Sequence, residues 1–466
     1  MAQRQQPMVI LSEDNERTQG EDAQDSNIRA GKAVANSVRT TLGPKGMDKM
    51  LVGSSGDVTI TNDGATILNE MDIEHPAAQM LVEVAETQEI EVGDGTTTAS
   101  VLAGELLAEA EELLDQDLHP TVIVEGYHEA AKLAHEAVDD QTLAVDLDDD
   151  TLEAVARSSM TGKGTGDVTV DTLAEPVVTA VQQVATDAGV DREDIHIHTH
   201  PGASTSATEL IEGVVIDETP LDDAAPSQLA EATTAILDTD LEFDTGEADA
   251  EYNITDVDQL NEAIAAEEEE LEGYADAIVD AGVELLFVTG DIDDRVASHL
   301  AAEEIVAFED IGSSDADAIA AATGARQLGT LEDIEDADLG TTAALSVETY
   351  GEDEFTFVEG ADAAHVSLFV RGSTDHVVDE LERALNDALD VVIAALDAGG
   401  VVGGAGAAEN AIADHVRGHA ASVDSRKQLS IKPFATAVDA LPRTLAVNTV
   451  MEQIHVLVEL LARHAA

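Results

Sequence analysis

Cysteine is absent from this chain of 466 residues, and basic residues are scarce. Without cysteine the chain can form neither disulfide bonds nor thiolate metal sites. Lysine and arginine number 21 against 98 aspartate and glutamate residues, so the formal net charge is −77. Because nucleic-acid binding depends on clustered lysine and arginine that neutralise phosphates, this composition argues against a nucleic-acid partner.

Long apolar runs are also missing from the chain. No stretch approaches the roughly 20 apolar residues of a membrane-spanning helix, so the sequence predicts no membrane partner. The amino terminus carries only the short apolar run Met8–Leu11 before it turns acidic, which is not the pattern of a signal peptide. We therefore expect a cytoplasmic protein.

The chain does contain acid throughout its length, interleaved with periodic valine, leucine, isoleucine and alanine. Hydrophobic residues make up 44% of the chain, which is enough to bury real cores, whereas a disordered acidic tail would have few of them. Self-repulsion would destabilise a compact fold in dilute buffer, but at molar salt the Debye length falls to roughly 3 Å. The composition therefore favours a folded protein of a high-salt cytoplasm over an acidic protein of ordinary cytosol.

The order of predicted elements is helical, mixed, then helical, in a length that suggests about two to four domains. The first part combines a β-hairpin at 50–61 with predicted helices at 22–43, 76–90, 96–114, 120–138 and 148–158. The middle part has a predicted helix at 256–282 and short apolar runs typical of strands at 195–198, 213–216, 235–237, 285–288 and 305–308. A helix at 376–397 and further helices complete the chain. We predict a multidomain α+β protein with a mixed domain inserted into a helical one.

The loop Gly93-Asp94-Gly95-Thr96-Thr97-Thr98 is the strongest local signal of chemistry. Its glycines let backbone N–H groups approach an anion, and the helix that starts at Thr96 presents its positive end to phosphate. Asp94 would repel phosphate unless a cation lay between them, and Mg²⁺ prefers such a carboxylate. The alternative is that Asp94 is simply an acidic helix N-cap.

Three further segments are candidates when they are considered with this loop. Leu42-Gly43-Pro44 follows a helix, Asp63 lies at a strand-to-helix turn, and Asp387 lies within a predicted helix. Taken singly, the Leu42–Pro44 segment and the turn at Asp63 are more typical of ordinary turns. Taken singly, Asp387 is more typical of a solvated residue on the surface of an acidic helix. A water molecule that attacks a γ-phosphoryl group needs positioning and charge neutralisation, which two carboxylates from distant segments could supply.

Several ordered stretches together resemble the group II chaperonin (thermosome) family, in particular its haloarchaeal members. The resemblance runs from about residue 20 to the last residue. The stretches that carry it are Thr41–Met50, Thr61–Leu68, Gly93–Ala99, Ser159–Gly164, Glu209–Val215 and Val377–Ala384.

The resemblance implies a site for ATP and Mg²⁺, with K⁺ as a candidate further ion. The residues that it implies for the phosphates are Leu42, Gly43, Pro44, Gly93, Gly95, Thr96, Thr97 and Thr98. It implies that Asp94 binds Mg²⁺ and that Asp63 and Asp387 position and activate the attacking water. Lys163 would reach toward the γ-phosphate, and Gly404 and Gly406 would lie near the ribose.

The resemblance also implies the domain organisation and the activity. A mostly helical equatorial domain (1–149 and 399–466), a small intermediate domain (150–213 and 365–398) and an inserted α/β apical domain (214–364) would form a subunit of a double ring. ATP hydrolysis would close a lid over unfolded client proteins. The lid protrusion is expected at 240–275, with Tyr252, Ile254, Leu260, Ile264 and Leu271; the alternative is an ordinary amphipathic acidic helix.

The chain departs from the family pattern at several positions. The family continues for a few dozen residues beyond Ala466, with further pocket residues and a strand that pairs with a neighbouring subunit. Ala405 stands for an expected glycine, Ser373 replaces a glycine at an expected hinge, and Val450 is expected to press on the base. We therefore weigh two hypotheses: a Mg²⁺-dependent ATPase subunit of a double ring, and a non-hydrolysing or stand-alone client-binding paralogue.

Histidines offer a different candidate site. His196, His198 and His200 alternate and would share one strand face, where they could bind a transition metal or simply be solvated at a strand edge. His415 and His419 have the i, i+4 spacing of a second candidate pair. The sequence contains neither a G-x-x-x-x-G-K-[ST] nor an H-E-x-x-H motif, which excludes a P-loop ATPase.

Overall fold

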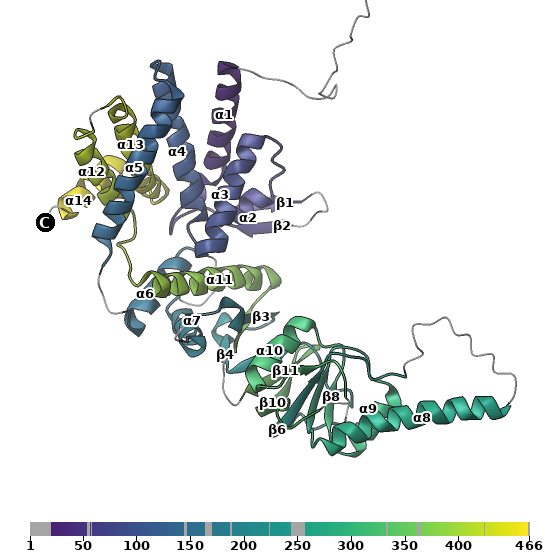
Figure 1. Ribbon diagram of the computed structural model, residues 1–466. Helices are drawn as coiled ribbons and strands as arrows, with labels where there is room; N and C mark the ends of the chain where they lie inside the picture. Colours follow the sequence, from purple (N-terminus) through teal and green to yellow (C-terminus); the bar gives the residue numbers. More distant parts are fainter. Residues whose placement is uncertain are drawn as a thin grey trace, which may run out of the picture. The chain divides into compact units, whose positions relative to one another are not determined.

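The computed structural model describes residues 20–464 except positions 54–55, 57, 144–146, 164–169, 187–188, 223, 244–256, 332–333, 361–364 and 424. Of the helical residues, the side chains of 257–264, 461 and 463–464 are also outside the description. The chain folds as two compact units (Figure 1). One comprises Met1–Asp146 with Ala398–Ala466, and the other comprises Leu147–Asp397.

The first unit is mainly helical (Figure 1). Its long helices are α1 (Glu21–Val38), α3 (Pro76–Val92), α4 (Thr96–Asp115), α5 (Pro120–Gln141), α12 (Ala407–Ala420), α13 (Gln428–Asn448) and α14 (Gln453–His464). Its shorter elements are η1 (Arg39–Thr41), β1 (Lys49–Val52), β2 (Val58–Thr61) and α2 (Gly64–Asn69). The predicted hairpin is confirmed, since β1 and β2 pair antiparallel from Lys49 opposite Thr61 to Val52 opposite Val58.

Small residues bring α1 and α4 close together at the centre of this unit. A side chain at Gly104 would place its Cβ 2.2 Å from the Cβ of Ala35, and one at Gly31 would come 2.5 Å from a methyl of Leu107. Such distances leave no room for any larger residue. The start of α4 is thereby held on a rigid helical base.

The second unit contains a three-stranded sheet covered by helices. Its strands are β3 (Ile195–Pro201), β4 (Glu209–Ile211) and β12 (Val366–Gly372), in the order β3-β12-β4. β3 runs parallel to β12, and β4 runs antiparallel to it. One face of this sheet shares a core with α6 (Asp149–Met160), α7 (Val170–Val184) and α11 (Asp375–Ala398).

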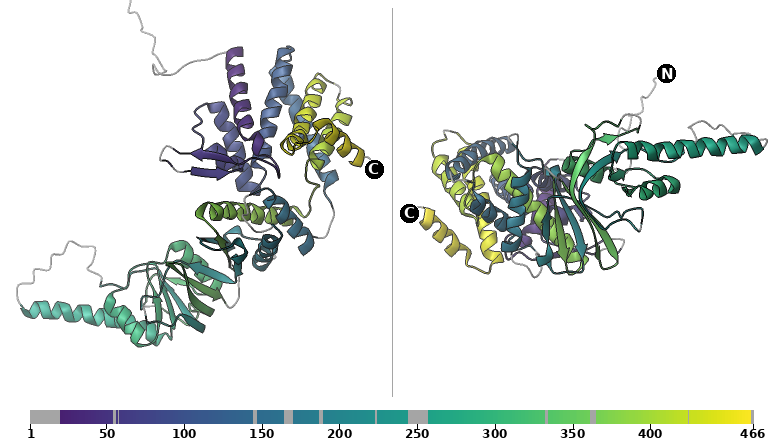
Figure 2. Two further views of the ribbon diagram at one scale, coloured as in Figure 1. Left: turned by 180° about the vertical axis from the view of Figure 1, so that it is seen from behind. Right: turned by 90° about the horizontal axis from the view of Figure 1, so that it is seen from below.

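A seven-stranded sheet forms the rest of the second unit (Figure 2). Its main path is β5 (Gly213–Ile216), β11 (Asp353–Gly360), β10 (Gly340–Tyr350), β6 (Gln228–Leu237), β7 (Leu285–Val288) and β8 (Val306–Phe308), with β9 (Gln327–Leu328) beside β6. One face packs on α10 (Ser313–Thr323). The other packs on α8 (Val257–Asp280) and α9 (Asp294–Ala302). The predicted order of helical, mixed and helical segments is confirmed.

The expected lid segment is only partly described. Tyr252 and Ile254 lie outside the described residues, as do the side chains of Leu260 and Ile264. Leu271 lies on α8 with 2% of its surface exposed, packed in the core that α8 shares with the sheet. The side chain of Leu271 therefore stabilises the fold and is not exposed on the surface of the expected lid segment.

Candidate functional site

The Gly93–Thr98 loop joins two helices through two glycines in the left-handed conformation. Gly93 ends α3 with φ 77°, and Gly95 precedes α4 with φ 87°. Residues with a Cβ are strained there, which explains glycine at both positions. No side chain caps α4, because its N-cap residue is Gly95. The positive end of a 20-residue helix therefore begins directly at Thr96, with Thr97 and Thr98 in its first turn.

Asp94 is held within this loop and does not cap the helix. Its Oδ1 accepts a hydrogen bond of 2.6 Å from the backbone N–H of Gly95. The side-chain amide of Gln88 donates to the carbonyl oxygen of Asp94 at 2.8 Å. The interpretation of Asp94 as an acidic N-cap is wrong, since Gly95 has that position.

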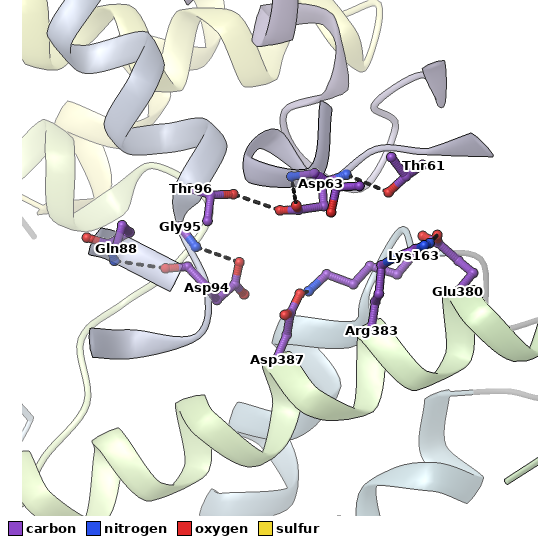
Figure 3. Close-up of polar contacts among 11 residues, drawn as sticks. Thr61, Asp63, Gln88, Asp94, Gly95, Thr96, Lys163, Glu380, Arg383 and Asp387 are labelled. Carbon is purple, nitrogen blue, oxygen red and sulfur yellow. Dashed lines mark hydrogen bonds and ion pairs between the residues drawn. The ribbon is translucent and has the colours of Figure 1, made fainter. Parts of the chain in front are cut away.

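Asp63 connects a second segment to the loop (Figure 3). It is the N-cap of α2, where its Oδ2 accepts from the backbone N–H of Thr66 at 2.6 Å. Its Oδ1 accepts from the hydroxyl of Thr96 at 2.8 Å. Both oxygens of this carboxylate thus join the first turn of α2 to the first turn of α4.

Gly64 makes the contact between these two helices close. A Cβ at Gly64 would lie 2.5 Å from Oγ1 of Thr97 and 2.8 Å from its backbone nitrogen. Only glycine fits without displacing the loop. Gly64 was not among the predicted site residues, although a glycine directly after an aspartate at a strand-to-helix turn was a usable signal.

The Leu42–Pro44 segment is anchored to α13. Leu42 is 9% exposed and belongs to the core that also contains Ala65 and Val101. Gly43 has φ 85°, and a Cβ there would approach a methyl of Leu445 to 2.4 Å. The side-chain amide of Asn448 donates to the carbonyl of Leu42 at 2.8 Å, so Asn448 is a supporting residue that sequence reasoning missed.

The segment around Gly404 and Gly406 begins α12. Gly406 is the N-cap with φ 85°, and a Cβ there would lie 2.7 Å from Cβ of Pro442 on α13. Around Gly404 the space that a Cβ would occupy is open. Ala405 has φ 57° and Val450 has φ 59°, so both non-glycine residues adopt a strained left-handed backbone. The side chain of Val450 is 93% exposed.

The second unit holds the other two predicted residues as an ion pair (Figure 3). The ammonium of Lys163 pairs with Oδ2 of Asp387 on α11, and their side chains are only 13% and 16% exposed. The alternative interpretation of Asp387 as a solvated surface residue is therefore wrong. A carboxylate this far buried is stabilised by a charged partner, and Lys163 is such a partner.

Of the alternating histidines, His200 is buried at 9% exposure, whereas His196 and His198 are partly exposed. The ring centroid of His200 lies 5.0 Å from that of Phe355 and 6.0 Å from that of Tyr350. His415 and His419 have ring centroids 4.3 Å apart. Among the described residues, no group of three or more histidines or acidic residues is arranged to hold a metal ion.

The part of the chain that the structure describes also contains no helix with the length and apolar character needed to cross a membrane.

The fold and these loops define the class of protein as a chaperonin. A model of the TCP-1/cpn60 chaperonin family matches residues 34–466, and the chain therefore belongs to this family. It is 62% identical to thermosome subunit 3 of Haloferax volcanii over 463 residues, 99% of this chain and 88% of that protein. It is 49% identical to thermosome subunit alpha of Halobacterium salinarum over 461 residues, 98% of this chain and 82% of that protein.

A more distant relative extends the same result. Thermosome subunit beta of Methanothermobacter thermautotrophicus is 46% identical over 466 residues, 100% of this chain and 86% of that protein. The predicted resemblance to group II chaperonins is confirmed. Because members of this family are ATP-driven, the chain is an ATP-hydrolysing molecular chaperone, and the hypothesis of a non-hydrolysing paralogue is not favoured.

Proposed function

We propose that the first unit binds ATP with Mg²⁺ at the Gly93–Thr98 loop. The observation that carries this proposal is the uncapped start of α4 beside two left-handed glycines, which is suited to phosphate. Leu42, Gly43 and Pro44 complete the phosphate contacts, and Gly404 and Gly406 approach the ribose. Asp94 offers a carboxylate oxygen as a magnesium ligand, and the bound cation would neutralise phosphate charge.

Asp63 and Asp387 are proposed to position and activate the attacking water. Asp63 is suited to this role because it accepts a hydrogen bond from Thr96 of the Gly93–Thr98 loop. Asp387 is suited because its carboxylate is largely buried, so that few bulk water molecules compete for it. A phosphoryl transfer needs such positioning and charge stabilisation more than covalent catalysis.

Lys163 gives the second unit a response to nucleotide. In the structure its ammonium neutralises Asp387. We propose that the γ-phosphate competes for this ammonium, after which Asp387 is available to accept a proton from water.

The proposed domain roles follow the cores of the structure. The three-stranded sheet with α6, α7 and α11 has its own core, which supports an intermediate domain at 150–213 and 365–398. The seven-stranded sheet has separate cores on its two faces, which supports an apical domain at 214–364. We propose that this domain binds unfolded clients, that the subunit assembles with others in a double ring, and that it works in a high-salt cytoplasm.

Asp387→Asn tests the proposal with a side chain of nearly the same size that cannot accept a proton. We expect phosphate release in molar KCl with Mg²⁺ to fall by a factor of at least about 100, the lower range for a general base, while ATP still binds. The matched control is Asp397→Asn, which changes an exposed aspartate on the same helix. A native rate in Asp387→Asn would contradict the assignment, and loss of ATP binding would indicate a structural role.

A further inference from the structure

Three imidazoles lie in a row on one face of β3. His196, His198 and His200 alternate along the strand, which lies at an edge of the three-stranded sheet. The neighbouring Ile195 is 1% exposed and belongs to the core with α7 and α11 on the opposite face. We call the three imidazoles the histidine row.

The middle member of the histidine row contacts the seven-stranded sheet directly. Nε2 of His198 lies 2.7 Å from Oδ1 of Asp217, the residue that follows β5. Its ring also packs 5.6 Å from the ring of Phe355 on β11. Since β5 and β11 belong to the seven-stranded sheet, His198 joins the two sheets of the second unit.

The last member of the row contacts the turn between β10 and β11. Nε2 of His200 lies 3.2 Å from the carbonyl oxygen of Tyr350, and its Nδ1 lies 3.9 Å from Oδ2 of Asp353. The guanidinium of Arg371 also lies close, since it donates to the carbonyl of His200 and stacks on the ring of Tyr350. His200 is therefore a second connection between the sheets.

The first member of the row faces α10. His196 and Asp315, in the first turn of α10, influence each other electrostatically. Burial raises the pKa of Asp315, and charged His198 and His196 lower it. Burial lowers the pKa of His196, which also has the ring of His365 at 4.6 Å. Other charged groups near the row include Arg192, Glu193, Asp194, Glu218, Asp317 and Glu382.

His198 and His200 thus each lie near an aspartate outside the three-stranded sheet, Asp217 at 2.7 Å and Asp353 at 3.9 Å, and His196 lies across a cavity from α10. We propose that the histidine row is a proton-controlled clasp between the three-stranded and seven-stranded sheets, looser when the imidazoles are neutral and tighter when they are protonated. Protonation gives the imidazole a positive charge, so its hydrogen bond to a carboxylate becomes an ion pair as well, with attraction between opposite charges. Histidine is suited to this role because its charge changes near neutral pH.

The surroundings of the row leave space for movement. The chain passes between the two sheets at only two places in the described sequence order, from β4 to β5 and from β11 to β12. A cavity of about 740 Å³ lies beside His196, between β3 and the face of α10 that carries Ala318 and Ala321. Its lining includes the carboxylates of Glu193, Asp194 and Asp317 as well as the guanidinium of Arg192, so it selects no single ligand charge. It leaves the region between β3 and α10 unfilled by side chains.

The absence of cysteine makes a direct distance measurement straightforward. Glu175→Cys on α7 and Asp280→Cys on α8 place two spin labels at exposed positions, the first beside the three-stranded sheet and the second beside the seven-stranded sheet. Pulsed electron spin resonance would record the distance distribution at about pH 8 and about pH 5.5 in molar KCl. We expect the distribution to narrow at the lower pH.

Two variants separate the clasp from a general effect of acid. His198→Gln keeps a hydrogen-bond donor without a titratable charge, and Asp217→Asn removes the facing carboxylate. We expect both to lose the narrowing, whereas the control His128→Gln, at an exposed position of the first unit, retains it. Narrowing in His198→Gln equal to the native response, or no pH response in the native sequence, would overturn the proposal. The measurement needs no nucleotide, so its outcome is independent of the proposed ATP site.

Discussion

His365 should make the second unit sensitive to acid. It lies directly before β12, is 2% exposed, and its Nε2 has no hydrogen-bond partner in the structure. Burial, with a smaller contribution from His196, lowers the pKa of His365 from 6.5 to about 4. A charged imidazole in this position would lack both water and a hydrogen-bond acceptor, which explains the direction of the change.

The sign and size of the effect follow from proton linkage. In the unfolded chain His365 binds a proton below about pH 6.5, whereas in the folded chain it does so only near pH 4. Stability is therefore complete above pH 6.5 and is lost as the pH falls toward 4. At about pH 5 the loss amounts to about 2 kcal/mol, since each unit of pKa difference corresponds to about 1.4 kcal/mol.

Hydrogen exchange is the suitable assay, because a chain of two compact units has no single free energy of unfolding. Protection of the buried amides of β12 would be compared at about pH 7 and about pH 5, corrected for intrinsic exchange. His365→Phe keeps a ring beside His196 but cannot bind a proton, so it should lose about 2 kcal/mol less than the native sequence. Equal losses in both proteins would refute the reasoning.

Two further predictions concern the first unit. Gly64→Ala should weaken ATP binding, because the new Cβ would lie 2.8 Å from the backbone nitrogen of Thr97 and displace the Gly93–Thr98 loop. Isothermal titration would measure the affinity, and an unchanged value would show that the loop tolerates the shift. Val450→Gly should stabilise the unit by about 1 kcal/mol, because φ is 59° at a side chain that is 93% exposed. Thermal denaturation would record this gain, and a lower melting temperature would show that Val450 has packing partners that offset its strain.

The local parts of the site could be predicted from the sequence, because their signals are local. Gly93 and Gly95 mark left-handed positions, and Asp63 marks a helix start, whatever lies elsewhere in the chain. The contact between Asp63 and Thr96 could not be derived in this way, because 33 positions separate the two residues. Such contacts depend on how helices pack, and only the family resemblance indicated them.

The fold was predicted unevenly for similar reasons. The strands β5, β7 and β8 are continuous apolar runs and were found, whereas β10 and β11 were missed. Their hairpin turns at Gly351, with φ 74°, and both strands mix apolar residues with threonine and glutamate in place of one continuous apolar run. Helix α7 was also missed, because Pro176 lies inside its periodic apolar pattern. The pairing of His198 with Asp217 depends on two sheets meeting, which no local pattern reports.

The two hydrogen bonds of Asp63 connect the stability of the protein to its rate of turnover. The carboxylate of Asp63 accepts one hydrogen bond from the first turn of α2 and one from the hydroxyl of Thr96. Rotation of this carboxylate toward a water molecule would weaken one of these two bonds. The reactive arrangement would then be a slightly less stable form of the resting fold. Substitutions that rigidify the first turn of α2 would raise thermal stability and slow ATP hydrolysis together. The rate of ATP hydrolysis would also depend more steeply on temperature than the affinity for ATP does.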